Sequence, residues 1–284
     1  MTLRQFTQEL SQTFRSLNFE QPLSEAQFLI SGVLGQTRTQ IISNDQQELS
    51  IYQLALLQAA VHRRSQGEPL AYILGTKDFY KAQFAVGPQV LIPRPETELM
   101  VETALEKFSV VNQPLQMADF GAGTGCIGIS ILLERPMAKL VAIENSVEAQ
   151  SFLKKNITTY LLDTRVTIYA GTVESFHRAQ RFDLIVANPP YIAWGDPNVM
   201  GAVYQFEPHE ALYADEDGLG AIRRWAKKSV ELLKPEGVLL IEIGAGQDEQ
   251  WRREPWSTYG LRLIEIRNDL AGLPRLLVMM LDSK

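Results

Sequence analysis

Cysteine is almost absent, because the 284-residue sequence has a single one, Cys126. One cysteine cannot form an intrachain disulfide or a thiolate zinc cluster, so a reducing compartment is permitted. No stretch approaches the roughly 20 apolar residues of a membrane span, and the first residues lack the basic and then apolar pattern of a secretory leader. We therefore expect a cytoplasmic protein with no membrane partner.

Histidine and excess positive charge are also lacking. The three histidines, His62, His177 and His209, do not have the spacing of metal ligands, and we assign no metal. Lysine and arginine number 27 against 33 aspartates and glutamates, a net charge of −6. That balance disfavours a domain that grips a phosphate backbone along a broad basic face.

What is present is an ordinary globular composition, with 45% hydrophobic and 21% charged residues. At roughly 100–200 residues per domain, the length indicates two domains, or one domain with an extension. Two capping-box patterns predict helices near the N-terminus, one at Ser24 with Gln27 and one at Ser50 with Gln53. The expected helix ends carry glycines: Gly32 or Gly35 for the first helix, and Gly67 for the second.

After Gly67, short apolar pieces separated by turn residues continue to Ile92 and are typical of a β-hairpin connector. From about Pro95 onward, strand-like runs alternate with helix-like ones. That alternation predicts an α/β fold with mostly parallel strands. We place the strands at residues 117–120, 140–143, 166–169, 183–187, 238–243, 261–266 and 275–281.

A glycine-rich turn, Gly121-Ala122-Gly123-Thr124-Gly125, follows the first of these strands and opens a helix. Glycines let the backbone approach a ligand closely. The spacing lacks the wider final gap of the dinucleotide fingerprint, and no Lys-Ser or Lys-Thr pair follows as in a P-loop, so pyrophosphate is the less favoured ligand. A purely structural turn stays open as an alternative.

Two further features stand at strand ends. Glu144 ends the second strand, where a carboxylate can accept both hydroxyls of a ribose, or can simply be solvated. Asn188-Pro189-Pro190-Tyr191 follows a buried strand. The Asn188 oxygen and the Pro189 carbonyl can accept hydrogens from one NH2 group, and Tyr191 offers a flat face. This loop indicates a planar amide or base amine as the substrate; the alternative is a rigid proline turn.

The sequence resembles the HemK/PrmC family, S-adenosylmethionine-dependent methyltransferases that modify a glutamine side-chain nitrogen in peptide chain release factors. The similarity covers nearly the whole chain. The motifs that carry it lie at residues 67–75, 90–98, 121–125, 144, 188–192, 207–208 with 211–212, 217–219, and 242–244 with 247.

The resemblance implies a class I S-adenosylmethionine-dependent methyltransferase fold, a Rossmann-like seven-stranded sheet whose final strand is antiparallel. It also implies a helical release-factor-docking domain at residues 1–72, a β-hairpin linker at 73–95 and a catalytic domain at 96–284. The cofactor residues expected on this basis are Asp119, Gly121, Ala122, Gly123, Thr124, Gly125, Glu144, Val173 and Asn188.

The same resemblance implies Asn188, Pro189, Pro190 and Tyr191 as the residues that bind the target glutamine, with Asn188, Pro189 and Tyr191 as the catalytic ones. The sequence departs from the family at two places. Thr172 and Val173 stand where an acidic and then an aromatic residue often lie beside the adenine, and Glu144 replaces the commoner Asp. The expected partners are release factors, without direct nucleic acid contact, and the enzyme is expected to be a monomer.

Alternatives remain at this point. A nucleic-acid adenine methyltransferase presents a similar planar NH2, a ribosomal-protein glutamine methyltransferase shares the same chemistry, and a non-catalytic cofactor-binding scaffold is a third possibility. Arg94 and Glu96 either support the cofactor pocket or form a structural ion pair at a helix start, and we favour the ion pair. Glu207, His209 and Glu210 either line the substrate entrance or are solvated loop charges. Cys126 is interpreted as a small packing residue.

Overall fold

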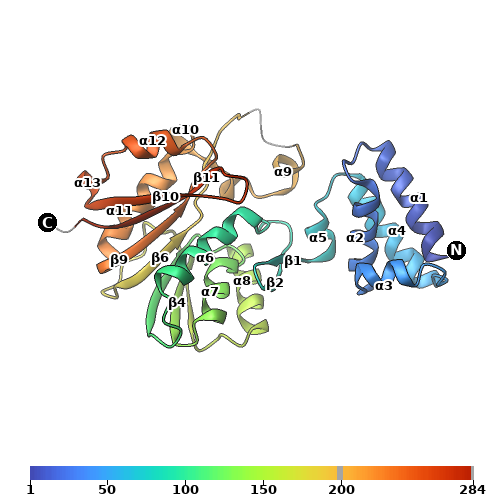
Figure 1. The fold of residues 1–284 in the computed structure, drawn as a ribbon, viewed down its shortest axis with the longest axis horizontal. Coiled ribbons are helices and arrows are strands. Elements are labelled where there is room, and N and C mark those ends of the chain that lie inside the picture. The colour runs from blue at the N-terminus through green and yellow to red at the C-terminus, as the bar shows by residue number, and fades with distance from the viewer. Residues whose placement is uncertain (197–200, 283–284) are drawn as a thin grey trace. The chain divides into compact units, whose positions relative to one another are not determined.

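The computed structural model describes residues 1–196 and 201–282, and the chain divides into two compact units, Met1–Thr76 and Lys77–Lys284 (Figure 1). The first unit is helical: α1 (Leu3–Ser16), α2 (Pro22–Leu34), α3 (Arg38–Ser43), α4 (Ile51–Ser65) and α5 (Leu70–Leu74). Leucines, isoleucines and Phe14 from these helices form a core of their own. Among the described helices of both units, none combines the length and the apolar composition needed to cross a bilayer.

The helix ends of the first unit follow local capping chemistry. The predicted capping box at Ser50 and Gln53 is confirmed, and Thr2 and Thr37 begin α1 and α3 with the same pattern. The predicted box at Ser24 is wrong: α2 begins at Pro22 and Ser24 lies inside it, because a proline is already set for the first helical position. Gly35 ends α2 in the left-handed conformation, as predicted.

The hairpin after the helical unit consists of β1 (Thr76–Phe79) and β2 (Ala82–Ala85), which confirms the predicted β-hairpin. Two of the apolar pieces assigned to it differ. Leu70–Leu74 is the helix α5, which ends where Gly75 takes a left-handed φ of 73°. Residues 90–92 form no strand, because prolines follow at once and the Ile92 N–H donates to the Glu207 side chain instead of to a ladder.

The second unit is built on a seven-stranded sheet of order β10-β11-β9-β6-β3-β4-β5. Strand β11 pairs antiparallel with both β10 and β9, and the other described pairs of this sheet are parallel, so the predicted fold class is confirmed. The strands are β3 (Leu115–Phe120), β4 (Ala138–Glu144), β5 (Val166–Ala170), β6 (Phe182–Ala187), β9 (Leu233–Glu242), β10 (Leu261–Asn268) and β11 (Pro274–Leu281). Every predicted strand is found; six lie within two residues of their expected ends, and β9 begins five residues earlier than expected.

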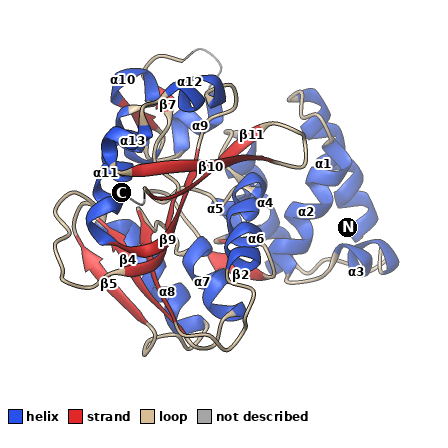
Figure 2. Cartoon of the chain, turned by 60° about the vertical axis from the view of Figure 1, so that its left-hand side comes forward, coloured by secondary structure: helices blue, strands red, loops and turns tan. Residues whose placement is uncertain are grey.

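Helices cover both faces of this sheet (Figure 2). Because alternate side chains of a strand point to opposite faces, Met117 packs into one apolar cluster and Ala118 into the other. The first cluster includes α6 (Glu98–Lys107), α7 (Cys126–Glu134) and α8 (Val147–Thr159), with the 3-10 turn η1 (Pro95–Thr97) preceding α6. The second includes α11 (Gly220–Leu232), α12 (Asp248–Arg253) and α13 (Trp256–Tyr259).

An insertion between β6 and α11 was not foreseen from the sequence. Its described parts are β7 (Ile192–Ala193), α9 (Gly201–Phe206), η2 (His209–Ala211), β8 (Tyr213–Ala214) and α10 (Asp215–Gly218). Strands β7 and β8 pair in parallel as a separate two-stranded sheet. Because this insertion leaves directly from the carboxyl end of β6, its residues are available to wall a site at that edge of the main sheet.

Candidate active site

A cavity of about 480 Å³ lies at the carboxyl ends of the parallel strands of the second unit. Its wall includes Gly121 after β3, Glu144 at the end of β4, Gly171 after β5 and Asn188 after β6. Ligands of open α/β sheets bind at this edge, where the loops that follow the strands converge. The cavity is therefore the candidate active site.

Most of the residues predicted for the site line this cavity, namely Gly121, Ala122, Gly123, Thr124, Glu144, Val173, Asn188 and Pro190. The other four, Asp119, Gly125, Pro189 and Tyr191, are not among its wall residues. The structure thus brings the glycine turn, the acidic strand end and the Asn-Pro-Pro-Tyr loop to one place. Along the sequence, Asn188 lies 63 positions after Gly125 and 67 positions after Gly121.

The glycine turn serves two purposes. Gly121 and Gly123 have left-handed φ values of 65° and 55°. A Cβ on Gly121 would come within 2.6 Å of the Trp225 ring, so this glycine allows close packing. A Cβ on Gly123 would find its nearest neighbour, Val90, only at 3.8 Å, so this glycine leaves room in the cavity wall.

Glu144 is held rigidly at the end of β4. Its Oε2 accepts a hydrogen bond from the Gly123 N–H at 2.8 Å, and its Oε1 accepts one from the Ser146 N–H at 2.8 Å. A carboxylate offers about four acceptor sites, so these two bonds orient it and leave acceptor capacity toward the cavity. The charge of Glu144 is therefore buried but supported by backbone dipoles.

Asp119 is buried beneath the turn. Its Oδ2 accepts from the Gly128 N–H in the first turns of α7, at 3.1 Å, and burial raises its pKa to about 7. We interpret Asp119 as an anchor for the start of α7. Burial also raises the pKa of the Cys126 thiol to about 12, so that residue stays a neutral packing group on the cavity wall.

The Asn-Pro-Pro-Tyr loop presents Asn188 to the cavity and turns Tyr191 away from it. The Asn188 Nδ2 donates to Thr97 Oγ1 at 3.4 Å, and the side-chain oxygen of Asn188 takes no part in this hydrogen bond. The Tyr191 hydroxyl donates to Glu242 Oε1 at 3.3 Å, and its carbonyl accepts from Gln247 Nε2 at 3.0 Å. Burial raises the pKa of Tyr191, so its hydroxyl remains protonated.

The expected ion pair of Arg94 with Glu96 is wrong, because Arg94 pairs with Glu207 at 2.5 Å. The second oxygen of Glu207 accepts the Ile92 N–H at 3.2 Å, and the side chain is buried. The sequence favoured Glu96 as the partner of Arg94 only because the two residues are close along the chain. The fold instead brings the carboxylate of Glu207, which follows α9, onto the segment before η1. Glu207 therefore ties together two walls of the cavity, while Glu210 lines it and His209 does not.

A turn with left-handed backbone conformations, at residues 216–218, packs against the backbone of the Asn-Pro-Pro-Tyr loop. Glu216, Asp217 and Gly218 have φ values of 51°, 57° and 86°. A Cβ on Gly218 would lie 2.4 Å from the Tyr191 carbonyl oxygen, so the turn presses directly on the loop backbone. Left-handed conformations cost roughly 1–2 kcal/mol for ordinary residues and persist where surrounding contacts impose them.

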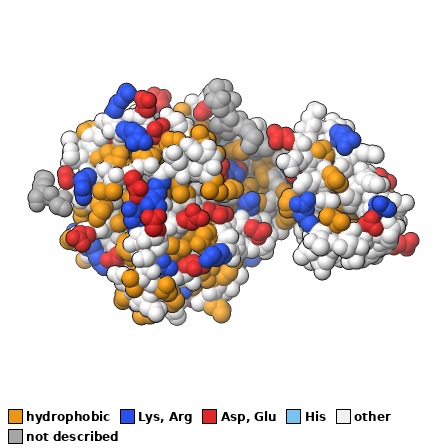
Figure 3. Space-filling view, viewed as in Figure 1, with side chains coloured by type: hydrophobic (Ala, Val, Ile, Leu, Met, Phe, Trp, Pro, Cys, Tyr) orange, Lys and Arg blue, Asp and Glu red, His pale blue; other side chains and the backbone are white. Residues whose placement is uncertain are grey.

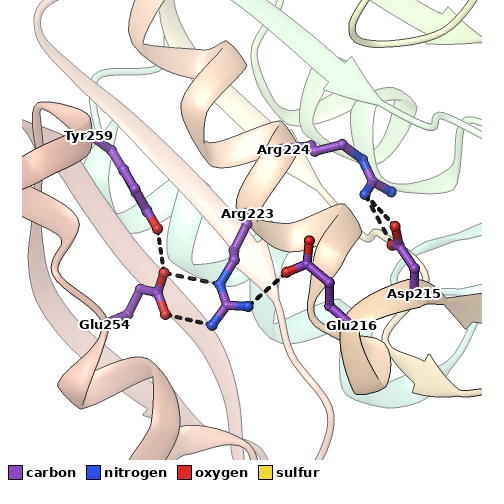
Figure 4. Close-up of polar contacts among 6 residues, drawn as sticks. All are labelled: Asp215, Glu216, Arg223, Arg224, Glu254 and Tyr259. Carbon is purple, nitrogen blue, oxygen red and sulfur yellow. Dashed lines mark hydrogen bonds and ion pairs between the residues drawn. The ribbon is translucent and has the colours of Figure 1, made fainter.

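Those surrounding contacts are ion pairs from α11 (Figure 4). Arg223 donates to Glu216 at 2.8 Å and forms a two-point pair with Glu254 at 3.0 and 2.9 Å. Arg224 donates to both oxygens of Asp215 at 3.0 and 2.9 Å. Two successive arginines thus hold the acidic turn in place beside the candidate site.

Several wall residues were missed by sequence reasoning. Asn145 and Ser146 directly follow Glu144, and the strand-end rule that selected Glu144 also covers them. Val90 and Leu91 come from the segment before η1, and Trp225 comes from α11. Val90 and Leu91 lie in the motif at residues 90–98 but were not assigned to the site from the sequence. No local signal marks Trp225, because it reaches the cavity through packing between distant segments.

Comparison with known proteins agrees with this geometry. A sheet with one reversed strand, helices on both faces, a glycine turn after β3 and an acidic residue at the end of the neighbouring β4 define the fold of a class I S-adenosylmethionine-dependent methyltransferase. A solved S-adenosylmethionine-dependent methyltransferase from Agrobacterium tumefaciens has this fold, with a TM-score of 0.51 at 14% identity over 73% of this chain and 70% of that one.

Two family descriptions match separate parts of the chain: the PrmC N-terminal domain over residues 5–75 and the Methyltransferase small domain over residues 96–204. Release factor glutamine methyltransferases from Burkholderia pseudomallei and Bordetella pertussis are 37% and 38% identical to it. These alignments cover 88% and 90% of this chain and 89% and 93% of theirs. The chain belongs to the release factor glutamine methyltransferase family.

Proposed function

We propose that this enzyme transfers a methyl group from S-adenosylmethionine to the side-chain amide nitrogen, N5, of the glutamine in the Gly-Gly-Gln motif of peptide chain release factors. The observation that carries the proposal is the position of Asn188, an amide acceptor on the wall of the cavity at the end of β6. Membership of the release factor glutamine methyltransferase family supports the choice of substrate.

The cavity wall suits the cofactor. We assign the methionine part to Gly121, Ala122, Gly123 and Thr124, where the open space beside Gly123 admits a ligand. The ribose is assigned to Glu144, whose remaining acceptor sites match two hydroxyls. A volume of about 480 Å³ falls within the usual range of cofactor sites. When bound, S-adenosylmethionine supplies an electrophilic methyl group on a sulfonium sulfur.

We assign the adenine of the cofactor to an apolar part of the cavity wall at Val173. Val173 is buried and lines the cavity, so it offers a hydrophobic wall in place of an aromatic ring. The Thr172 hydroxyl accepts from the Ser175 N–H at 3.2 Å and caps its own turn. Glu174 also lines the cavity here. We propose that shape, more than a dedicated carboxylate at position 172, recognises the base in this enzyme.

At the substrate end, this chain's task is to orient a weak nucleophile. A carboxamide nitrogen has its lone pair delocalised into the carbonyl, so it must be held in line with the departing sulfur. We propose that the Asn188 oxygen and the Pro189 carbonyl accept the two N–H bonds, which also favours the positive charge that develops on nitrogen. No strong base is needed, because the methylated nitrogen is acidic and loses its proton afterwards.

Mass spectrometry of a recombinant release factor after incubation with enzyme and cofactor tests the proposal. We expect a mass gain of one methyl group, located on the glutamine of the Gly-Gly-Gln peptide. A ribosomal protein with a glutamine acceptor and an adenine-containing DNA serve as competing substrates. Faster transfer to either would overturn the assigned substrate.

Surface charge favours a protein substrate over nucleic acid. On the face of the catalytic unit in Figure 3, Lys and Arg lie interspersed with Asp and Glu. Arg267, for example, is paired with both Glu106 and Glu265. Paired cations offer little to a phosphate backbone. We also propose that the enzyme acts as a monomer in the cytoplasm, without a metal and without direct nucleic acid contact.

We propose that residues 1–72 dock the release factor, that residues 73–95 form the linker and that residues 96–284 carry out the transfer. If docking helps, kcat/KM for a folded release factor should exceed that for an isolated Gly-Gly-Gln peptide by about tenfold or more, because remote contacts help to position the reacting group. Steady-state methylation of both substrates measures this. Equal kcat/KM values would refute the docking role.

The turn beneath the loop provides a further prediction. Gly218→Ala places a Cβ against the Tyr191 carbonyl, and we expect single-turnover methyl transfer to fall about tenfold because the loop is displaced. Gly272→Ala is the matched control, since Gly272 also has a left-handed φ but an added Cβ there would meet no atom within 4 Å. Gly272→Ala should lose only the smaller stability cost of a side chain at a left-handed φ and keep the wild-type rate, whereas Gly218→Ala should lose both rate and thermal stability. Equal rates in both variants would contradict the role of the turn.

A further inference from the structure

Four aromatic side chains gather on the insertion that follows the Asn-Pro-Pro-Tyr loop, and the proposed reaction has so far no use for them. They are Trp194 directly after β7, Tyr204 on α9, His209 in η2 and Tyr213 on β8. Trp194 stacks on Tyr213 with ring centroids 4.6 Å apart, and Tyr204 lies against His209 at 4.7 Å. His209 connects the two pairs, since its ring lies 5.5 Å from Tyr213 and 6.3 Å from Trp194. We call these four residues the aromatic cluster.

Two members of the aromatic cluster are open to solvent but held in place. Trp194 is 65% exposed and Tyr204 is 57% exposed. Tyr213, by contrast, is buried and supports the Trp194 ring from one side. The His209 Nε2 donates to the Tyr204 carbonyl oxygen at 2.8 Å, because a carbonyl can only accept. Exposed tryptophan and tyrosine rings that are already positioned in this way are typical of binding surfaces.

The aromatic cluster adjoins the candidate active site. Strand β7 begins directly after Tyr191 and pairs in parallel with β8, where Tyr213 lies, so the cluster is attached to the end of the Asn-Pro-Pro-Tyr loop. Residues 208, 210 and 211, on either side of His209, line the cavity. A polypeptide that extends one side chain into the cavity to Asn188 therefore has the aromatic cluster beside its own backbone.

The charge of the insertion favours a polypeptide as the occupant of this surface. Residues 182–222, which include the whole aromatic cluster, contain no lysine or arginine and seven aspartates and glutamates. Surfaces that stack the bases of single-stranded nucleic acid combine aromatic rings with a positively charged groove. Because this segment carries the opposite charge, stacking of bases is disfavoured, and contact with an uncharged stretch of protein backbone is not.

Resting on the proposed function, we propose that the aromatic cluster binds the backbone of the two glycines that precede the target glutamine of the release factor. Glycine has no Cβ, so its backbone can lie flat against a ring that a larger residue would hold at a distance. The N–H and Cα–H groups of a glycine segment then face the electron-rich side of the ring. These contacts lie away from the reacting nitrogen, so the cluster is a binding surface that positions the glutamine.

The test is the dissociation constant of a fluorescently labelled Gly-Gly-Gln peptide, measured by anisotropy with the full chain saturated in S-adenosylhomocysteine. Trp194→Ala should weaken peptide binding about tenfold, because central aromatic residues carry much of the binding energy of an interface. Trp194→Phe should bind more tightly than Trp194→Ala, since a flat ring remains. Leu270→Ala is the matched control: it removes a fully exposed apolar side chain between β10 and β11 and should bind as wild type.

A second peptide, in which alanine replaces both glycines, tests the contact with glycine itself. We expect it to bind the wild type about tenfold more weakly than the glycine peptide does. In Trp194→Ala the same change should cost only about twofold, because the ring that excludes the added methyl groups is absent. Equal losses in the two enzymes would show that the ring does not contact the glycines and would overturn the proposal.

Kinetics with a folded release factor provide an independent measurement. Trp194→Ala should lower kcat/KM about tenfold through a higher KM, because the contact is made equally in the ground state and the transition state. Circular dichroism and titration with S-adenosylhomocysteine verify that the variant is folded and binds the cofactor product. A folded Trp194→Ala with wild-type values for both peptide binding and KM would refute the role of the cluster.

Two further outcomes are distinguishable from these. Binding of a single-stranded oligonucleotide that is lost in Trp194→Ala would assign the aromatic cluster to nucleic acid and overturn the proposal. Failure of the proposed function looks different, since the wild-type enzyme would then transfer no methyl group to the glutamine of the folded release factor.

Discussion

Asn188→Ala is expected to lower the single-turnover rate of methyl transfer by about 100-fold or more at saturating S-adenosylmethionine. The substitution removes the side-chain acceptor that we assign to the target amide, and losses of this size follow the removal of one oriented polar contact to a transition state. Cofactor affinity should change far less, because Gly121, Gly123 and Glu144 remain in the cavity wall. The measurement is a rapid-quench assay with radiolabelled cofactor.

Companion variants identify the cause of that loss. Asn188→Asp keeps an oxygen but adds a charge near the sulfonium, so it should also be impaired. Asn268→Ala, at the exposed end of β10, is the control and should retain the wild-type rate. Near wild-type transfer by Asn188→Ala would show that the amide clamp is assigned wrongly.

Tyr191 does not line the cavity, so we expect it to support the shape of the Asn-Pro-Pro-Tyr loop through its contacts with Glu242 and Gln247. Tyr191→Ala should impair placement of the glutamine, and Tyr191→Phe should be milder because the ring is kept. Since the Tyr191 hydroxyl donates to Glu242, the residual effect of Tyr191→Phe reports on that bond.

Glu144→Ala is expected to weaken S-adenosylmethionine binding about 10- to 100-fold. Hydrogen bonds to a charged group contribute about 1.5–3 kcal/mol, and about 1.4 kcal/mol corresponds to a factor of ten in affinity. The variant also removes the acceptor of the Gly123 and Ser146 N–H groups, so the glycine turn loses an anchor. Isothermal titration calorimetry with the purified enzyme measures the effect.

Two controls separate ribose binding from general loss of charge. Glu144→Asp keeps the carboxylate with a shorter reach and should bind more tightly than Glu144→Ala. Glu102→Ala removes an exposed carboxylate of α6 that does not line the cavity, and should leave the dissociation constant unchanged. An unchanged dissociation constant in Glu144→Ala would refute the ribose assignment.

Local sequence determined the secondary structure of this protein well. The strands of the sheet were found because uninterrupted apolar runs bounded by turn residues are a local property, and the helix start at Ser50 was found because a capping box needs only four residues. Where two local signals competed, the sequence was misleading: Pro22 began α2 ahead of the box at Ser24. The short helix α5 was missed because five apolar residues are too few to show a period.

The sequence also located the candidate site, since the glycine turn, Glu144 and Asn188 all follow predicted strands, and parallel strands place such residues at one edge. The tertiary structure alone decided the partners of these residues. Arg94 pairs with Glu207 over 113 positions and Asn188 with Thr97 over 91, and Tyr191 turns from the cavity to Glu242. The direction of a side chain and the identity of its partner depend on which segments pack together, and that packing is set by the whole chain at once.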